Sequence, residues 1–139
     1  MKSVFYVLIF IFAPLLSSGQ STLTIKVEGL KKNKGELFIG LYNNEKTFKN
    51  TDSVFVKQII SVDSLVMKTK MENLPDGQYA LTLFHDENSN GKLDKNFLGA
   101  PKERYGFSNN PRIVFKSPQF KKCQFPVSGD TEVLIKMKK

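Results

Sequence analysis

Cysteine and histidine are almost absent from this chain of 139 residues, which has Cys123 and His85 as its single examples and has no tryptophan. One cysteine excludes a disulfide within the chain and every zinc site built from several cysteines. One histidine excludes metal centres that need two imidazoles. The sequence favours a small buried side chain for Cys123 over the alternative, a reactive thiol activated by the lysines before it.

Long apolar runs are missing except at the N-terminus, where residues 4–16 are apolar and follow Lys2. The small residues Ser17, Ser18 and Gly19 follow this run. This pattern is typical of a secretory signal peptide that is cleaved after Gly19. The run is shorter than the roughly 20 residues of a transmembrane helix, although an uncleaved anchor is the alternative. We therefore expect residues 1–19 to be a signal peptide. Residues 20–139 would form a single periplasmic or secreted domain without a transmembrane segment.

Apolar repeats of helical period are also missing, and alternation of apolar and polar residues dominates. We expect the first two runs below to pair as an antiparallel hairpin, and the run at 79–84, apolar on both faces, to be central. Six to eight short strands predict an all-β antiparallel sandwich of the immunoglobulin-like kind. The runs are residues 22–27, 37–42, 54–60, 65–71, 79–84 and 132–138, with weaker candidates at 112–116 and 124–127.

Negative charge is in short supply, since 13 acidic residues face 21 basic ones and the formal net charge is +8. Such an excess attracts nucleic acid, anionic polysaccharide or lipid head groups. The lysines, however, are scattered over turns and outward strand faces, and no nucleic-acid-binding motif is present. A solvated surface is the favoured interpretation, with no nucleic-acid partner. A basic surface protein for anionic polymers is an alternative.

Residues 87–111 lack clear alternation, and a loop of that length inside a compact domain is usually functional or disordered. Its aromatic residues argue against disorder, so we expect it to fold over one end of the sandwich. The sequence favours a small loop core for Phe97 and Phe107 over an exposed binding role. For Tyr105 the sequence favours neither of these two roles.

This loop begins with a cluster of oxygen-bearing side chains that predicts a calcium site. The spacing D-x-N-x-N-G-x-x-D copies the first nine positions of an EF-hand loop, with Gly91 at the sharp turn. Calcium prefers hard oxygen ligands, and we expect weak affinity, on the order of 10⁻⁴–10⁻³ M. The predicted ligands are the side chains of Asp86, Asn88, Asn90 and Asp94 and the carbonyl of Lys92.

The match to a calcium loop is incomplete, because Phe97 occupies the twelfth position, where a bidentate glutamate is usual. Glu87 or Glu103 would have to supply that carboxylate from elsewhere. The alternative is that aspartate, asparagine and glycine serve here only as turn formers that bond their own backbone.

A long motif surrounds the loop. It consists of PDGQY at residues 75–79, HDENSNGKLD at 85–94, GAPKE at 99–103 and YGFSNN at 105–110. In this motif the chain resembles the secreted bacterial family catalogued as domain of unknown function 2141. The likeness extends to Pro118, Phe120, the region of Phe125 and the first hairpin, and so covers nearly all of the mature chain.

The resemblance implies an exported β-sandwich domain and implies no activity. Two departures are Ala100, where the family more often has a bulkier apolar residue, and Cys123, where a small residue is usual. The turn at 74–79 also resembles, more weakly, that of transthyretin-like and carboxypeptidase-regulatory-like sandwiches. Such likenesses bear on fold rather than on function.

Together these features predict a monomeric, non-enzymatic module that calcium stabilises and that binds a glycan or a protein through residues 86–111. The candidate ligand-binding residues are Glu103, Arg104, Tyr105, Asn109 and Asn110. The alternative is a small hydrolase that uses loop carboxylates near His85 for acid–base work. No nucleophile motif or phosphate loop supports that alternative, so we expect no catalysis.

Overall fold

A computed structural model describes residues 19–139, and this part of the chain is almost entirely β-structure. The predicted signal peptide lies outside the described residues except for Gly19. None of the described helices is long and apolar enough to cross a membrane. The elements are β1 (Ser21–Glu28), β2 (Glu36–Tyr42), η1 (Thr51–Ser53), β3 (Val56–Ser61), β4 (Met67–Leu74), β5 (Gly77–Asp86), β6 (Tyr105–Phe107), α1 (Phe120–Cys123), β7 (Phe125–Val127) and β8 (Thr131–Lys136).

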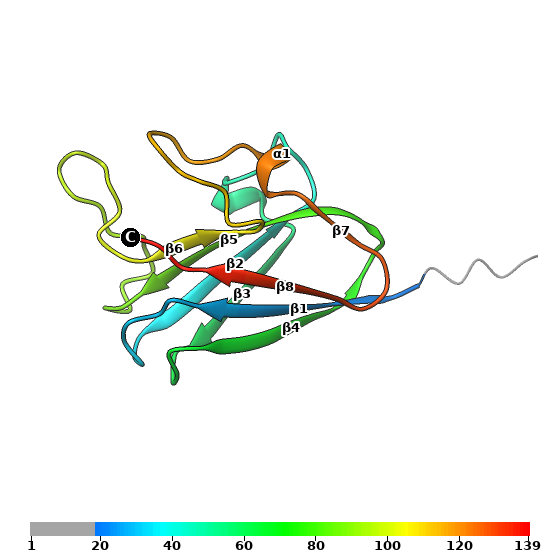
Figure 1. Cartoon of the computed structure of the whole chain (residues 1–139), viewed down its shortest axis with the longest axis horizontal. Helices are drawn as coiled ribbons and strands as arrows, with labels where there is room; N and C mark the ends of the chain where they lie inside the picture. Colours follow the sequence, from blue (N-terminus) through cyan, green and yellow to red (C-terminus); the bar gives the residue numbers. More distant parts are fainter. Residues whose placement is uncertain (1–18) are drawn as a thin grey trace, which may run out of the picture.

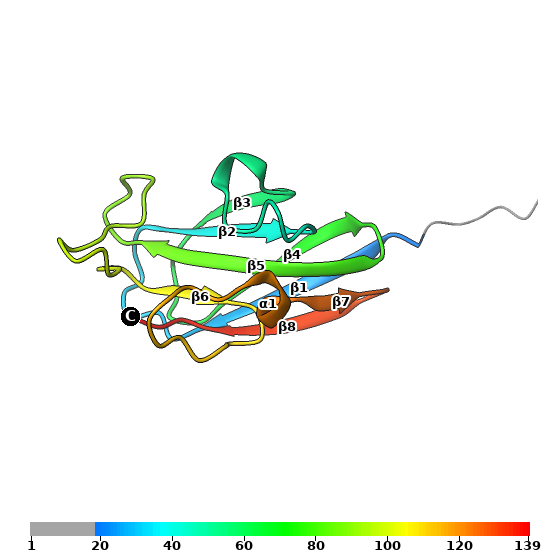
Figure 2. The same cartoon turned by 90° about the horizontal axis from the view of Figure 1, so that it is seen from above.

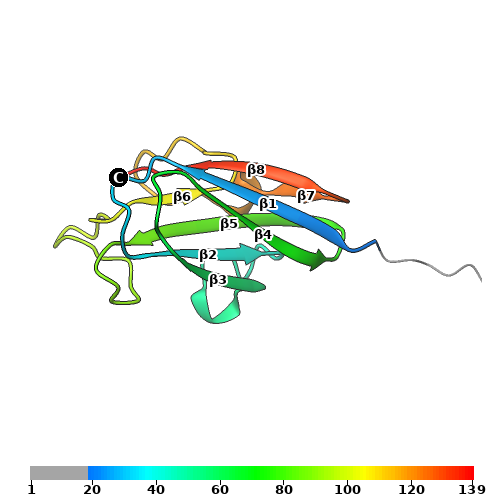
Figure 3. The same ribbon diagram turned by 90° about the horizontal axis from the view of Figure 1, so that it is seen from below.

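The strands form two sheets that pack face to face (Figure 1). One sheet has the order β4-β1-β8, in which β1 lies between its neighbours and pairs in parallel with β8 (Figure 3). The other has the order β3-β2-β5-β6, which can be followed in Figure 2, and β7 pairs with β5 beside this path. The predicted β-sandwich is confirmed, and β5 is central as expected.

The main core lies between the sheets, and period-2 alternation supplies it. In β1, Leu23, Ile25 and Val27 are completely buried, while the threonines and lysine between them face outward. Leu37 of β2 and Leu81 of β5 are equally buried on the facing sheet. Each sheet therefore contributes one apolar face, which is the packing that stabilises a sandwich.

The predicted hairpin of the first two runs is wrong. β1 pairs with β4 and β8, whereas β2 pairs with β3 and β5 in the other sheet. The link between them crosses from one sheet to the other and passes through Gly29 and Gly35, both with positive φ. Two half-apolar strands bury their apolar faces equally well when they face each other across a core, and alternation alone does not distinguish that arrangement from a hairpin.

The two weaker strand predictions have mixed outcomes. The weak candidate at 124–127 is confirmed as β7, but residues 112–116 form no strand. The long loop contains β6, which the sequence analysis missed because three residues are too few to show alternation. It also missed α1, a single helical turn.

A second, aromatic core covers one end of the outer face of the five-stranded sheet. Residues 43–55 and α1 close over it. Its buried members are Tyr42, Phe48, Ala80, Phe107, Phe120 and Cys123. The predicted burial of Cys123 and of Phe107 is confirmed. The loop-core prediction is wrong for Phe97, which is 95% exposed because it lies at the tip of a tight turn.

Cys123 is expected to be chemically inert in the folded protein. Burial raises the pKa of its thiol to about 11, so the thiolate fraction at pH 8 falls roughly 100-fold below that of an ordinary cysteine. Reaction with a disulfide reagent at pH 8 should therefore be at least that much slower in buffer than in denaturant. A reaction equally fast in both conditions would contradict the burial of this side chain.

Candidate ligand-binding surface

The two outer faces of the sandwich differ in chemistry. The outer face of the three-stranded sheet is polar, with Lys68 paired to Glu132 and Lys26 paired to Glu28, both at 3.0 Å. Exposed charged pairs of this kind are typical of a solvated surface. This face therefore offers little to a ligand.

The outer face of the five-stranded sheet has a row of apolar side chains. The strand registers place Ile59 beside Phe38, Phe38 beside Phe84, and Phe84 beside Tyr105. The rings of Phe38 and Phe84 stack with centroids 4.7 Å apart and planes 11° apart. The ammonium of Lys57 lies 5.6 Å from the centre of the Phe38 ring.

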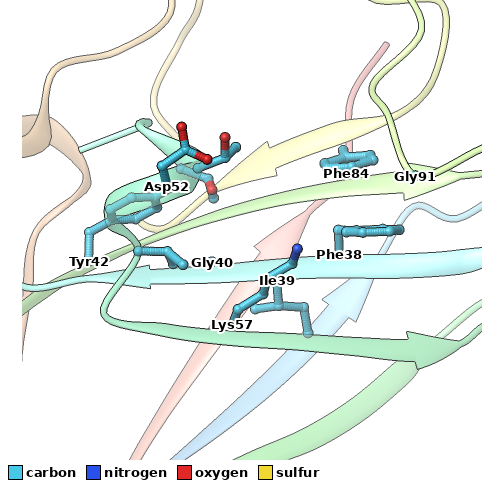
Figure 4. Close-up of a pocket in the computed structure, with 11 residues that line it drawn as sticks. Phe38, Ile39, Gly40, Tyr42, Asp52, Lys57, Phe84 and Gly91 are labelled. Atoms are coloured by element: carbon cyan, nitrogen blue, oxygen red, sulfur yellow. The ribbon is translucent and has the colours of Figure 1, made fainter. Parts of the chain in front are cut away.

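A depression of about 240 Å³, the sheet hollow, lies beside the stacked rings (Figure 4). Its floor is Gly40, where a Cβ would approach Tyr42 Cε2 to 3.1 Å and Thr82 Oγ1 to 3.2 Å. A side chain at this position would therefore crowd the residues that line the hollow. Its polar lining side chains carry the carboxylate of Asp52, the ammonium of Lys57 and the hydroxyls of Tyr42, Thr51 and Thr82.

A larger depression of about 570 Å³, the loop groove, lies between residues 93–101 and 113–117. Thr82 and Phe84 line both depressions and therefore lie between them. The charged residues of the loop groove are Lys49, Lys95 and Lys116, and none of the described residues that line it is acidic. The groove is thus apolar in its walls and positive at its rim.

The structure brings the predicted calcium ligands together at the end of β5. The buried carboxylate of Asp86 accepts hydrogen bonds from the backbone N–H of Asn90 at 3.2 Å and of Gly91 at 2.6 Å. Asp94 accepts from the amides of Asn88 at 2.7 Å and Asn90 at 3.0 Å, and these bonds lower the pKa of its carboxyl. Gly91 has a φ of 76°, which suits the sharp turn. We call residues 86–94 the Asp/Asn loop.

Glu103, which lies outside this loop in the sequence, joins its two ends. It is 6% exposed, and its two oxygens accept the backbone N–H groups of Glu87 at 2.9 Å and Asp94 at 3.0 Å. The carboxylate of Glu87 itself pairs with Lys32 at 2.5 Å, which lowers its pKa. Within residues 19–139, no group of three or more acidic, histidine or cysteine side chains is placed to hold a metal. An ion here would depend on amide and carbonyl oxygens as well.

Comparison with known proteins places this chain in a family. A model built for uncharacterized proteins conserved in bacteria, DUF2141, matches residues 25–135. The chain belongs to the DUF2141 family. No curated protein and no solved structure matches it.

The DUF2141 match confirms the resemblance seen in the sequence and reaches from β1 to β8. It includes the aromatic core, most of the main core, the Asp/Asn loop and the two depressions. The family description assigns no activity, so the site must be interpreted from its own geometry.

Most polar residues predicted to bind a ligand instead bond the protein backbone. Arg104 donates to the carbonyl of Met137 at 3.5 Å, and the Asn109 amide donates to that of Gln124 at 2.7 Å. Asn110 bonds the carbonyl of Leu134 at 2.8 Å and the N–H of Lys136 at 2.7 Å. Of the predicted ligand-binding set, Tyr105 lines the loop groove.

The sequence did not reveal Phe38, Gly40, Lys57 and Phe84 as site residues. A signal existed, because residues 37–42 and 79–84 are apolar on both faces and one of those faces has to lie outside the main core. Strand pairing, which the sequence did not reveal, is what makes Phe38 and Phe84 neighbours.

Proposed function

We propose that this DUF2141 protein is an exported, non-enzymatic module that binds a glycan in the sheet hollow. One observation carries the proposal: a stacked aromatic wall stands beside a hollow that has carboxylate, ammonium and hydroxyl groups around it. Ligand sites combine apolar walls with a few convergent polar groups, and sugars offer C–H surfaces together with hydroxyls.

The distribution of acidic groups supports binding over hydrolysis. Glycosidases use two carboxylates that flank the bond to be broken, whereas Asp52 is the one acidic residue that the described lining of the sheet hollow includes. His85 lines neither depression. It is completely buried, and its Nε2 donates to the carbonyl of Lys34 at 2.7 Å.

Removing the charged groups of the sheet hollow is expected to weaken glycan binding. Lys57→Ala and Asp52→Ala should each reduce affinity about tenfold or more, because a hydrogen bond to a charged group contributes about 1.5–3 kcal/mol. The measurement is a glycan array followed by calorimetric titration of the best ligand. Both residues are exposed, so the melting temperature should stay close to that of the unmodified domain.

Lys70→Ala is the matched control, since Lys70 is an exposed lysine of β4 on the polar outer face. It should bind as the unmodified protein does. An array without any signal would contradict the glycan proposal, and a screen of extended peptides would then test the protein-ligand alternative. Equal losses in Lys57→Ala and Lys70→Ala would indicate general charge attraction instead.

We also propose that the Asp/Asn loop binds calcium weakly and stabilises the wall of the sheet hollow. Two facts support this role: the four predicted side chains lie in one hydrogen-bonded cluster, and Gly91 at its turn also lines the hollow. The ligands would be the oxygens of Asp86, Asn88, Asn90 and Asp94, with the carbonyl of Lys92. Both carboxylates already accept hydrogen bonds, and each oxygen retains a free lone pair.

Calcium is expected to raise the melting temperature of the domain. With a dissociation constant of about 0.3 mM, 5 mM calcium would stabilise the folded state by about 1–2 kcal/mol, or several degrees. The measurement is thermal unfolding in calcium and in chelator, with Asp94→Asn as the variant that should lose the shift. Identical midpoints in calcium and chelator would refute calcium binding.

A further inference from the structure

We propose that the tips of two loops beside the loop groove dock the protein on an anionic lipid bilayer. The tips are Phe97 with Leu98 and Val114 with Phe115, and we call them the apolar tips. They are 95%, 77%, 64% and 96% exposed, the four highest values among the large apolar side chains of the described chain. This surface is separate from the sheet hollow, and the inference does not depend on glycan binding.

The apolar tips lie on one side of the molecule. Both loops line the loop groove, so they face each other across it. In Figure 1 the yellow-green and orange segments rise on the same side of the sheets. A flat bilayer surface can therefore contact both tips at once.

The turn at residues 96–100 holds Phe97 and Leu98 outward. The side-chain oxygen of Asn96 accepts the N–H groups of Leu98 and Ala100, both at 3.0 Å. The backbone adds bonds from Gly99 to Asn96 at 2.9 Å and from Asn96 to Ala100 at 2.8 Å. Backbone polar groups without partners are costly in lipid, and this turn pairs the N–H groups of Asn96, Leu98, Gly99 and Ala100.

The charges around the tips suit anionic head groups. Lys95 and Lys116 line the groove directly beside the tips, together with Lys49. The nearest carboxylates along the first loop, Asp94 and Glu103, are already engaged by hydrogen bonds within the loop. Apolar side chains flanked by lysine are the combination that binds an anionic membrane surface, because insertion and electrostatic attraction then act together.

The opposite outer face reinforces this orientation. The three-stranded sheet presents lysine, glutamate and threonine to solvent, with Leu134, 37% exposed, as its one large exposed hydrophobe among the described residues. A bilayer would therefore meet the protein at the apolar tips rather than at this polar face.

Vesicle co-sedimentation tests the proposal with residues 20–139, which contain every described strand and both cores. The protein should bind vesicles of equal phosphatidylcholine and phosphatidylglycerol more tightly than vesicles of phosphatidylcholine alone. The partition coefficient of the double variant Phe97→Ala/Phe115→Ala should be lower than that of the unmodified protein by about tenfold or more. The reason is that two inserted phenyl groups are removed. Lys95→Glu/Lys116→Glu should abolish the preference for the anionic lipid.

The matched control is Leu65→Ala/Val66→Ala. These residues are 51% and 50% exposed but lie in the link between β3 and β4, outside the loop groove. The control should partition as the unmodified protein does. Lys57→Ala should also bind vesicles normally, which separates this surface from the sheet hollow.

A single introduced tryptophan gives a readout that does not depend on loss of binding. Because the sequence has no tryptophan, Phe97→Trp places the only one at a tip. Its emission should shift to the blue and be quenched by brominated lipid, whereas Leu65→Trp should show neither change. Absent vesicle binding, equal partition of the Phe97→Ala/Phe115→Ala variant, or an unshifted tryptophan at position 97 would each overturn the proposal. Tips that serve a protein partner instead would give the first of these results.

Discussion

Gly35→Ala is expected to destabilise the domain by about 3 kcal/mol or more, a large part of the 5–15 kcal/mol that holds a typical domain together. Gly35 has a φ of 75°, and a Cβ there would lie 2.1 Å from the carbonyl oxygen of Asp86 and 2.9 Å from the Cα of Glu87. Backbone atoms cannot rotate away as a side chain can. The start of β2 and the end of β5 would have to separate.

That separation would damage several contacts at once. The Gly35 carbonyl accepts the N–H of Val62 at 3.0 Å, and the neighbouring carbonyl of Lys34 accepts from His85 at 2.7 Å. Asp86, the first residue of the Asp/Asn loop, is the group displaced most directly. The measurement is the free energy of unfolding from urea titration at neutral pH.

Gly99→Ala is the control that separates steric overlap from backbone conformation. Gly99 also has a positive φ, 82°, but no atom lies within 4 Å of a Cβ built there. Its replacement should cost only the left-handed strain, about 1–2 kcal/mol. Equal losses in the free energy of unfolding for the two variants would show that steric overlap between position 35 and Asp86 does not destabilise the domain.

Glu103→Ala is expected to cost about 2–4 kcal/mol, because it leaves two part-buried backbone N–H groups without their charged acceptor. Those groups belong to Glu87 and Asp94, at the two ends of the Asp/Asn loop. The loop should open as well as weaken, since Glu103 is what joins its ends. Hydrogen exchange of these two amides, measured beside the free energy of unfolding, reports the opening directly.

Two further substitutions serve as controls for Glu103→Ala. Glu103→Gln keeps an oxygen acceptor and should lose less stability than Glu103→Ala. Glu72→Ala removes an exposed carboxylate from β4 and should change stability by no more than about 0.5 kcal/mol. Unchanged protection of the Glu87 and Asp94 amides in Glu103→Ala would refute the bridging role of Glu103.

The candidate site shows where prediction from sequence succeeded. The spacing of Asp86, Asn88, Asn90 and Asp94 is local, and a chain that turns at Gly91 brings such residues together whatever the rest of the fold does. The burial of Cys123 was likewise predicted, because a lone cysteine without a neighbouring base is usually a small apolar side chain.

Prediction failed where strand pairing or distant contacts decide. Glu103 looked like a surface ligand, but its partners are backbone groups 16 and 9 residues earlier in the chain. Asn110 bonds Leu134 and Lys136 across 24 and 26 residues. Polarity alone does not show whether such a side chain meets solvent or an unsatisfied backbone group.

By itself, the sequence determined that the described chain is an all-β sandwich, that its strands alternate apolar and polar residues, and that oxygen groups cluster after β5. These properties follow from alternation and from local turn chemistry, which act over a few residues. Only the tertiary structure decided that β1 and β2 lie in opposite sheets and that Phe38 stacks on Phe84. It alone also decided that Phe97 stands exposed rather than buried. The physical reason is that register and sheet order depend on the free energy of the whole packed domain, which no single segment specifies.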